Sequence, residues 1–210
     1  TVSAVAVDIE SVVRVNFNST TTDVSEDRAI SSLEDLSTDS AGPIKLVSVA
    51  GSLTIDGGSD GQGVSAAGNG DVLLKAAQNV TINASVVSVT GNITLDAVND
   101  LAVNASVTTG GTGTVYLTSG NDTTIDSVLT TISGDLLIET GSNLTQNAAI
   151  TSTAGDVGLI AGGSLDQASS GDITTGGDVL LEAGSDWTMS SGTEITATGN
   201  VSGQALSGDL

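Results

Sequence analysis

Hydrophobic and polar residues alternate along this chain in short patches that recur at a nearly constant interval. Each interval opens with a glycine, and successive opening glycines are 21 or 22 residues apart. These opening glycines are Gly70, Gly91, Gly113, Gly134, Gly155, Gly177 and Gly199. The first patch after each glycine places apolar residues two positions apart, as in Val72 and Leu74. Such a period of two is typical of a β-strand with one buried face.

Two further apolar patches follow in each interval, separated by Gly, Asn, Asp and Ser, which favour turns. The second patches contain Val80/Ile82, Leu101/Val103, Leu144, Leu165 and Trp187/Met189, and the third lie near Val86, Val107, Val128, Ile150, Ile173 and Ile195. One interval thus predicts three strands and three corners, which is one triangular coil. Stacked coils would share a core that no single coil can bury alone. We therefore predict an all-β fold, a parallel triangular β-solenoid with about 21–22 residues per coil.

The regularity of the pattern divides the chain into two regions. Gly42 also opens a coil, but the next opening glycine, Gly70, comes 28 residues later. We assign the surplus to a corner loop in the Gly/Asp-rich stretch 56–63. Regular repeats are expected over 42–210, and 1–41 is expected to form irregular coils or a cap or junction segment. Residues 26–36 also fit an amphipathic helix, and a strand set over 1–10 would bring the total to eight or nine coils.

Composition and charge narrow the possible partners. The net charge is −21, with 25 acidic and four basic residues, so a nucleic-acid phosphate backbone is excluded as a partner. No apolar run approaches the length needed to insert into a membrane. The chain lacks cysteine and histidine, and its four scattered cations do not form an anion-binding cleft. We therefore expect no enzyme activity. The first residue is not Met and the last ones resemble another coil opening, so we expect a processed protein or an excerpt.

The repeat resembles those of the filamentous haemagglutinin class of bacterial adhesins and related β-strand-repeat surface proteins. The resemblance is carried by the Gly-Asp-apolar openings at 70, 134, 155 and 177, and by the Asn-x-Thr/Ser strands that follow. It covers residues 42–199 well and 1–41 loosely. It implies a right-handed parallel β-helix displayed outside the cell.

Carboxylates recur at one corner of the predicted coils. Asp71, Asp135, Asp156 and Asp178 each follow an opening glycine, and Asn92 and Thr114 take the same place in other coils. Stacking would bring some of these carboxylates within one coil of each other, and Ca²⁺ would relieve their repulsion. The alternative is a solvated turn in which Asp accepts hydrogen bonds from local backbone N–H groups. Asp56 and Asp60 belong either to a second cation loop or to a simple flexible loop. No cofactor is required, and Ca²⁺ is the only candidate.

Eight Asn-x-Ser/Thr triplets provide candidate glycosylation sites. They begin at Asn18, Asn79, Asn83, Asn92, Asn104, Asn121, Asn143 and Asn200. Exposure on a secreted rod would make them acceptors, although repeated Asn-x-Thr/Ser strands also create such triplets automatically. Trp187 and Met189 occupy a second apolar patch, so we expect both to fill the core.

Two functions fit these features. The first is a structural extracellular rod, either the shaft of a surface adhesin or a subunit of a self-assembling filament. Its partners would be copies of itself stacked end to end, or the rest of a longer repeat polypeptide. The second is an adhesin module that recognises surface glycans through a solenoid face. Variation along one outward row weighs against regular recognition; the row is Lys75, Asp96, Thr118, Glu139, Ile160 and Glu182.

Overall fold

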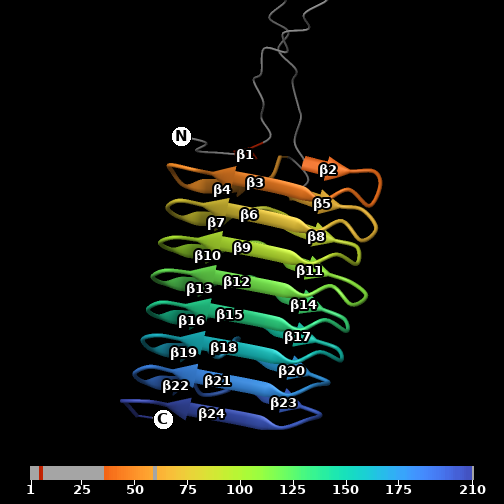
Figure 1. Ribbon diagram of the computed structural model, residues 1–210. Helices are drawn as coiled ribbons and strands as arrows, with labels where there is room; N and C mark the ends of the chain where they lie inside the picture. Colours follow the sequence, from red (N-terminus) through yellow and green to blue (C-terminus); the bar gives the residue numbers. More distant parts are fainter. Residues whose placement is uncertain (1–4, 7–35, 59–60, 210) are drawn as a thin grey trace, which may run out of the picture.

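The computed structural model describes residues 5–6, 36–58 and 61–209, and every regular element in them is a β-strand. The 24 strands form three sheets of eight, and each strand pairs in parallel with the equivalent strand one coil away. Figure 1 shows the coils stacked along one axis, with β24 at the end opposite β1. The predicted all-β, parallel, triangular solenoid is confirmed. Its handedness stays a prediction.

We name the sheets A, B and C in the order in which the chain visits them. Sheet A contains β1 (Val5–Ala6), β4 (Leu53–Asp56), β7 (Val80–Ile82), β10 (Leu101–Val103), β13 (Thr123–Ile125), β16 (Leu144–Gln146), β19 (Leu165–Gln167) and β22 (Trp187–Met189). Sheet B contains β2 (Leu36–Thr38), β5 (Gln62–Ala66), β8 (Ser85–Ser88), β11 (Val107–Thr109), β14 (Leu129–Thr131), β17 (Ile150–Ser152), β20 (Ile173–Thr175) and β23 (Ile195–Ala197). Sheet C contains β3 (Ile44–Ser48), β6 (Val72–Ala76), β9 (Ile93–Ala97), β12 (Val115–Ser119), β15 (Leu136–Thr140), β18 (Val157–Ala161), β21 (Val179–Ala183) and β24 (Val201–Ala205).

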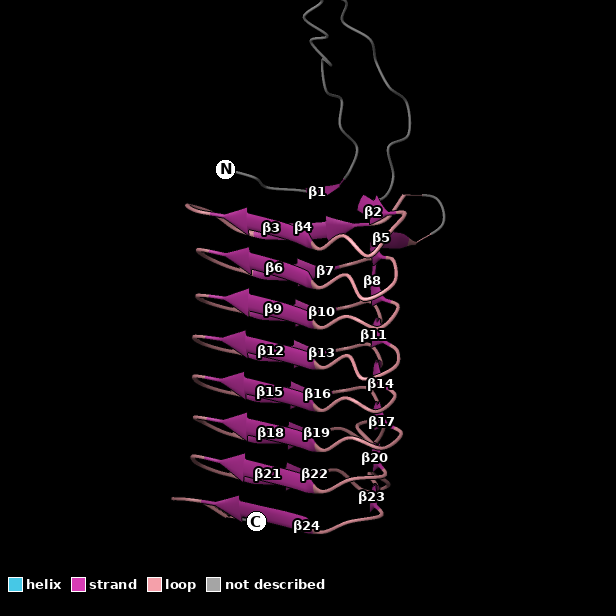
Figure 2. Ribbon diagram, turned by 45° about the vertical axis from the view of Figure 1, so that its right-hand side comes forward, coloured by secondary structure: helices cyan, strands magenta, loops and turns pink. Residues whose placement is uncertain are grey.

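The core fills the inside of the triangle as continuous rows of aliphatic side chains. Register partners are 21 or 22 residues apart, so Leu117 lies between Leu95 and Ile138, and all three are fully buried. Figure 2 shows the three strands of each coil meeting at corners. Because neighbouring strands are about 4.8 Å apart, the inward side chains of each coil pack against those of the next coil.

The opening glycines are required by close contact between coils. A Cβ atom at Gly134 would overlap the carbonyl oxygen of Gly113, one coil earlier. A Cβ at each of the other six opening glycines would likewise meet the carbonyl oxygen of the opening glycine before it. Gly42 differs, because its nearest atoms among the described residues would be 3.9 Å from an added Cβ. The recurrence of glycine in the sequence thus reflects backbone-to-backbone stacking.

Buried hydroxyl groups connect successive corners between sheets B and C. Ser88 Oγ donates to the carbonyl oxygen of Gly70 (2.8 Å) and accepts from the backbone N–H of Gly91 (2.9 Å). Ser152 forms the same bridge between Gly134 and Gly155. These hydroxyl groups provide hydrogen-bond partners for corner backbone groups that are not paired within a sheet. Buried polar groups need such partners. The Oγ1 of Thr131, in the same row, is the only buried side-chain polar atom of the described residues that lacks a hydrogen-bond partner.

A short row of amide groups runs through the core towards the last coil. Gln167 Nε2 donates to Gln146 Oε1 (2.8 Å), and Trp187 Nε1 donates to Gln167 Oε1 (2.9 Å). The half-buried Trp187 packs against the core, as expected. Met189 lies in register with the buried Gln167 and so belongs to the same inward row, with its side chain 41% exposed. Met189 lies on the last strand of sheet A, where no further described coil covers it.

One register assignment from the sequence is wrong. Leu129 pairs with Val107 and is fully buried, whereas Val128 is 45% exposed. Two adjacent apolar residues fit the third patch equally well, and the pleat decides which one faces the core.

The predicted corner loop between β4 and β5 is confirmed where it is described, and a register shift at Gln62/Val64 accompanies it. Most of 1–41 lies outside the described residues, including 26–35 of the alternative helix, whose last residue, Leu36, begins strand β2.

Candidate functional site

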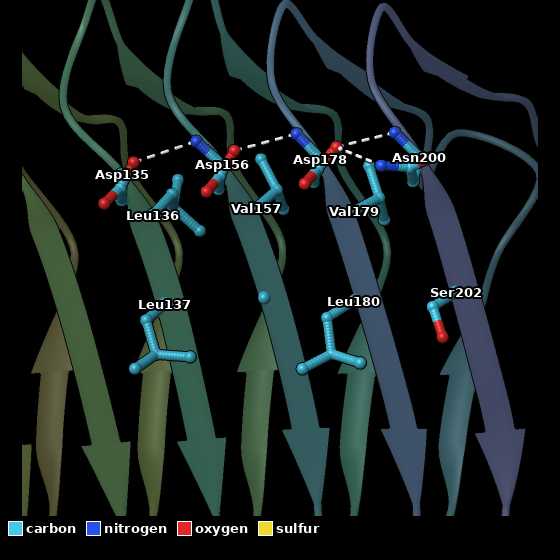
Figure 3. A pocket seen from close by; sticks show the side chains of 11 residues that line it. Asp135, Leu136, Leu137, Asp156, Val157, Asp178, Val179, Leu180, Asn200 and Ser202 are labelled. Atoms are coloured by element: carbon cyan, nitrogen blue, oxygen red, sulfur yellow. Dashed lines mark hydrogen bonds between the residues drawn. The ribbon is translucent and has the colours of Figure 1, made fainter.

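The outer corner in front of sheet C contains the recurring carboxylates predicted from the sequence. Figure 3 shows Asp135, Asp156, Asp178 and Asn200 in a line across four successive coils. All four side chains are exposed. The stacking of equivalent corner positions is therefore confirmed.

Each of these carboxylates accepts a hydrogen bond from the backbone of the next coil. Asp135 Oδ1 accepts the N–H of Asp156 (2.9 Å), and Asp156 Oδ1 accepts the N–H of Asp178 (2.8 Å). Asp178 Oδ1 accepts both the backbone N–H (2.6 Å) and the side-chain amide (3.2 Å) of Asn200. We call this bond, from a backbone N–H to the Asp or Asn side chain one coil earlier, an Asx rung.

Asx rungs also occur elsewhere on the solenoid. Asp71 and Asn92 form them in the same line, with donors one coil later at 2.8 and 3.0 Å. At the corner between sheets C and A, Asp122 accepts the N–H of Asn143 (2.9 Å) and Asp186 accepts that of Asp209 (2.9 Å). The sequence predicted solvated carboxylates that accept hydrogen bonds from local backbone N–H groups. The carboxylates are exposed as predicted, but the N–H groups that donate to them lie 21 to 23 residues further along the chain. The rungs explain why Asp and Asn recur at the corners.

Within the described residues, no group of three or more acidic side chains is arranged to hold a metal ion. Asp56 accepts a hydrogen bond from the side-chain amide of Asn83 (2.7 Å), and Asp60 lies outside the described residues. Calcium binding by Asp71, Asp135, Asp156 and Asp178 stays a prediction.

A shallow hollow of about 430 Å³ lies beside this corner on the outer face of sheet C. Gly158 lies between Leu137 and Leu180 in one outward row, so a side chain is missing from the middle of the row. Figure 3 shows the two leucine side chains flanking the gap, with the line of carboxylates along one edge. The hollow offers an apolar floor beside negative charge. Sequence reasoning missed it, although Gly at the second position of a strand was the available signal.

Further along sheet C, the outward side chains form polar pairs between coils. Lys75 Nζ and Asp96 Oδ2 form an ion pair (2.5 Å). Tyr116 donates from its hydroxyl to Glu139 Oε2 (2.5 Å). That hydrogen bond, followed by burial, raises the pKa of Tyr116 above its usual value. These contacts join neighbouring coils and do not surround a cavity.

The candidate glycosylation asparagines lie at corners. Of the candidates that the structure describes, Asn79 is half-buried, and the others are exposed: Asn83, Asn92, Asn104, Asn121, Asn143 and Asn200. Asn104 Nδ2 donates to Asn83 Oδ1 (2.7 Å), so neighbouring sequons contact each other across coils. Asn18 lies outside the described residues. Glycosylation stays a prediction.

A regular threonine row lies on the outer face of sheet B and was missed by sequence reasoning. It consists of Thr108, Thr130, Thr151, Thr174 and Thr196 in successive coils. The variable row considered from the sequence lies on sheet C, from Lys75 to Glu182. The signal was present in the sequence, as a threonine in the middle of the third strand in five successive coils. Cross-strand threonine pairs stabilise a sheet and also present hydroxyl groups at regular spacing.

Substitutions at Asp156 separate the rung from a cation site. Asp156→Ala removes the acceptor of the Asp178 N–H, and we expect it to lower the free energy of unfolding by about 1 kcal/mol. Asp156→Asn keeps an acceptor oxygen and reduces repulsion with Asp135 and Asp178, so its stability should equal or exceed that of the wild type. Urea denaturation with calcium and with chelator measures both. Stabilisation by calcium that Asp156→Asn abolishes would establish a cation site instead.

No helix in the described part of the chain is long and apolar enough to cross a membrane. Comparison of the chain with protein-family models, with curated proteins and with solved structures finds no match.

Proposed function

We propose that this protein is an extracellular structural rod, serving as the shaft of a surface adhesin or as a subunit of a filament. The observation that carries the proposal is the continuity of three parallel sheets through eight strands each. Hydrogen bonds between strands run along the rod axis, so each added coil extends the rod without requiring a new core. Such an architecture suits a stiff spacer.

The corners strengthen this interpretation. Asx rungs and buried hydroxyl bridges add hydrogen bonds between coils where the strands are interrupted. The rod is therefore joined at its corners as well as along its faces. The net charge of −21 keeps neighbouring rods apart in solution.

The resemblance to filamentous haemagglutinin-type repeats supports an extracellular location and a right-handed coil. The outer surface also favours a passive role, because the described residues place no histidine, cysteine or metal cluster beside the hollow on sheet C. We accordingly propose that the protein has no enzyme activity.

Recognition of glycans is the second candidate function, and the threonine row on sheet B favours it. Hydroxyl groups repeated one coil apart would match a polymer of repeating hydroxylated units. A glycan array with wild type and Thr130→Val/Thr151→Val tests this candidate. Binding that the double variant loses supports a recognition face, and the absence of binding by the wild type excludes the glycans on the array.

The rod proposal is tested by locating the protein on the cells that produce it. Antibodies raised against the purified chain should label intact cells, with the label on fibres or projections seen by electron microscopy. Labelling that requires permeabilised cells would contradict the proposal.

A further inference from the structure

The hollow on sheet C lies in the interior of the described solenoid, beside the line of carboxylates. We propose that it binds a linear aliphatic polyamine, whose methylene groups cover the apolar floor and whose ammonium groups contact Asp135, Asp156 and Asp178. The three strands under the hollow, β15, β18 and β21, each pair with a strand on both sides. The inference goes beyond the rod function, which does not require a ligand.

The hollow exists because one coil lacks an outward side chain. Gly158 lies in register between Leu137 and Leu180 on the outer face of sheet C. The space measures about 430 Å³, and Figure 3 shows the two leucine side chains on either side of it. Leu137 is half-buried and Leu180 is 41% exposed. A ligand in the hollow would therefore gain free energy by covering apolar surface.

The carboxylates beside the hollow are fixed in position and only partly used. Asp135, Asp156 and Asp178 each use Oδ1 to accept the backbone N–H of the next coil. The Oδ2 atoms accept no hydrogen bond from the described residues, and Figure 3 shows these second oxygens pointing away from the dashed bonds. The rungs hold one carboxylate in each coil, about 4.8 Å from the next. A ligand would thus meet charges that are already arranged, which lowers the cost of binding.

The charges around the hollow select a cation. Adjacent carboxylates in the line repel each other by about 1 kcal/mol in water, and a bound cation relieves this repulsion. On the other side of the leucine row, Ile160 lies in register between Glu139 and Glu182, so acidic residues border the apolar floor on both sides. The described lysines, Lys45 and Lys75, lie on β3 and β6, at least three coils from β15. They are too distant to neutralise these carboxylates.

The floor of the hollow selects a ligand whose uncharged part is apolar. β18 pairs along its whole length with β15 and β21, so its backbone offers no free hydrogen-bonding groups. A peptide backbone laid on this floor would lose water from its N–H and C=O groups without gaining partners, which is costly. A methylene chain has no such groups. Three methylene groups separate two ammonium groups by about 5 Å, which matches the spacing of the coils.

A carboxylate in the same line, but without a hollow beside it, provides a matched control. Asp71 forms the same rung to the next coil. Leu73 occupies the position in that coil which Gly158 occupies in its own, as the register of the intervening strands shows. The line of carboxylates continues past both positions, whereas the gap is present only at Gly158. Substitutions at Asp71 and Asp156 therefore separate the charge from the site.

NMR spectroscopy of the 210-residue chain titrated with spermidine tests the site. The titration is made at about 0.15 M salt, where exposed charges more than about 8 Å apart are screened. We expect saturable shifts of the Gly158 amide and of the methyl groups of Leu137 and Leu180. Asp156→Asn keeps the rung and removes one charge, so it should raise the Kd for spermidine about fivefold. Asp71→Asn removes the same charge elsewhere and should leave this Kd unchanged.

Gly158→Leu tests the hollow without changing any charge. The new side chain would complete the row between Leu137 and Leu180, and we expect the Kd for spermidine to rise at least tenfold. An added Cβ would meet Cδ1 of Leu137 at 2.9 Å, and this end of a flexible side chain can rotate away. Because glycine is unfavourable inside a strand, the urea midpoint of the variant should equal or exceed that of the wild type. Loss of binding would then not reflect loss of the fold.

Three results would overturn the proposal. Shifts spread equally over all acidic corners would mean that spermidine is only a diffuse counterion. A Gly158→Leu variant that binds spermidine like the wild type would mean that the hollow takes no part. Binding of Ca²⁺ or of a lysine-rich peptide beside Asp156, without binding of spermidine, would assign the site to another class of ligand. Each leaves the proposed rod function intact, since that function fails only if the protein is absent from the cell surface.

Discussion

Replacing Gly134 by alanine is expected to destabilise the solenoid by about 3 kcal/mol or more, at or above the upper end of the usual cost of adding a group where there is no room for it. The new Cβ would overlap the carbonyl oxygen of Gly113. Neither backbone can move without breaking strand pairs in sheet C, because β12 and β15 begin two residues after these glycines. Urea denaturation followed by circular dichroism measures the loss.

Gly42→Ala is the matched control for Gly134→Ala. It places the same methyl group at the equivalent corner, where an added Cβ would be 3.9 Å from its nearest described neighbours. The free energy of unfolding of the monomer should change by less than about 0.5 kcal/mol. Because each coil contacts only its neighbours, the damage from Gly134→Ala should also divide the transition into two steps. Equal effects of the two variants would contradict the account of the opening glycines.

Leu129→Asp is expected to have an effect of similar size, at about 4 kcal/mol or more, because it buries an unpaired carboxylate. Leu129 is fully buried between Val107 and Ile150 in sheet B. Val128→Asp, one residue earlier, should cost less than about 1 kcal/mol since Val128 is 45% exposed. Thermal denaturation of the two variants compares adjacent positions with the same substitution. If Val128→Asp were the more damaging variant, the register of β14 would be the one expected from the sequence alone.

The repeat was predictable from the sequence because two strong physical constraints act in every coil. The opening glycines from Gly70 to Gly199 recur because a Cβ there would collide with the previous coil, and the period of two follows from the pleat. Neither constraint chooses between adjacent apolar residues, so Val128 was assigned to the core in place of Leu129. A spacing that changes between 21 and 22 residues makes such a one-residue error easy.

The candidate site was only partly predictable. Asp135, Asp156 and Asp178 were recognised as a stacked set, but the donors of their hydrogen bonds lie a full coil away. The hollow depends on the absence of a side chain at Gly158 between two leucines that are distant in sequence. Features formed between coils become visible only when the register is known. The alternation of apolar and polar residues within one coil does not show which residues of the next coil lie beside them.

The central claim is that the coils are equivalent units that add length along one axis. Its most direct test is small-angle X-ray scattering of a variant in which residues 155–176, one complete coil, are repeated three more times. We predict a folded protein whose length increases by about 14 Å, three times the strand spacing, while its cross-section stays unchanged. A thicker particle, or one that loses its β-sheet circular dichroism, would contradict the claim.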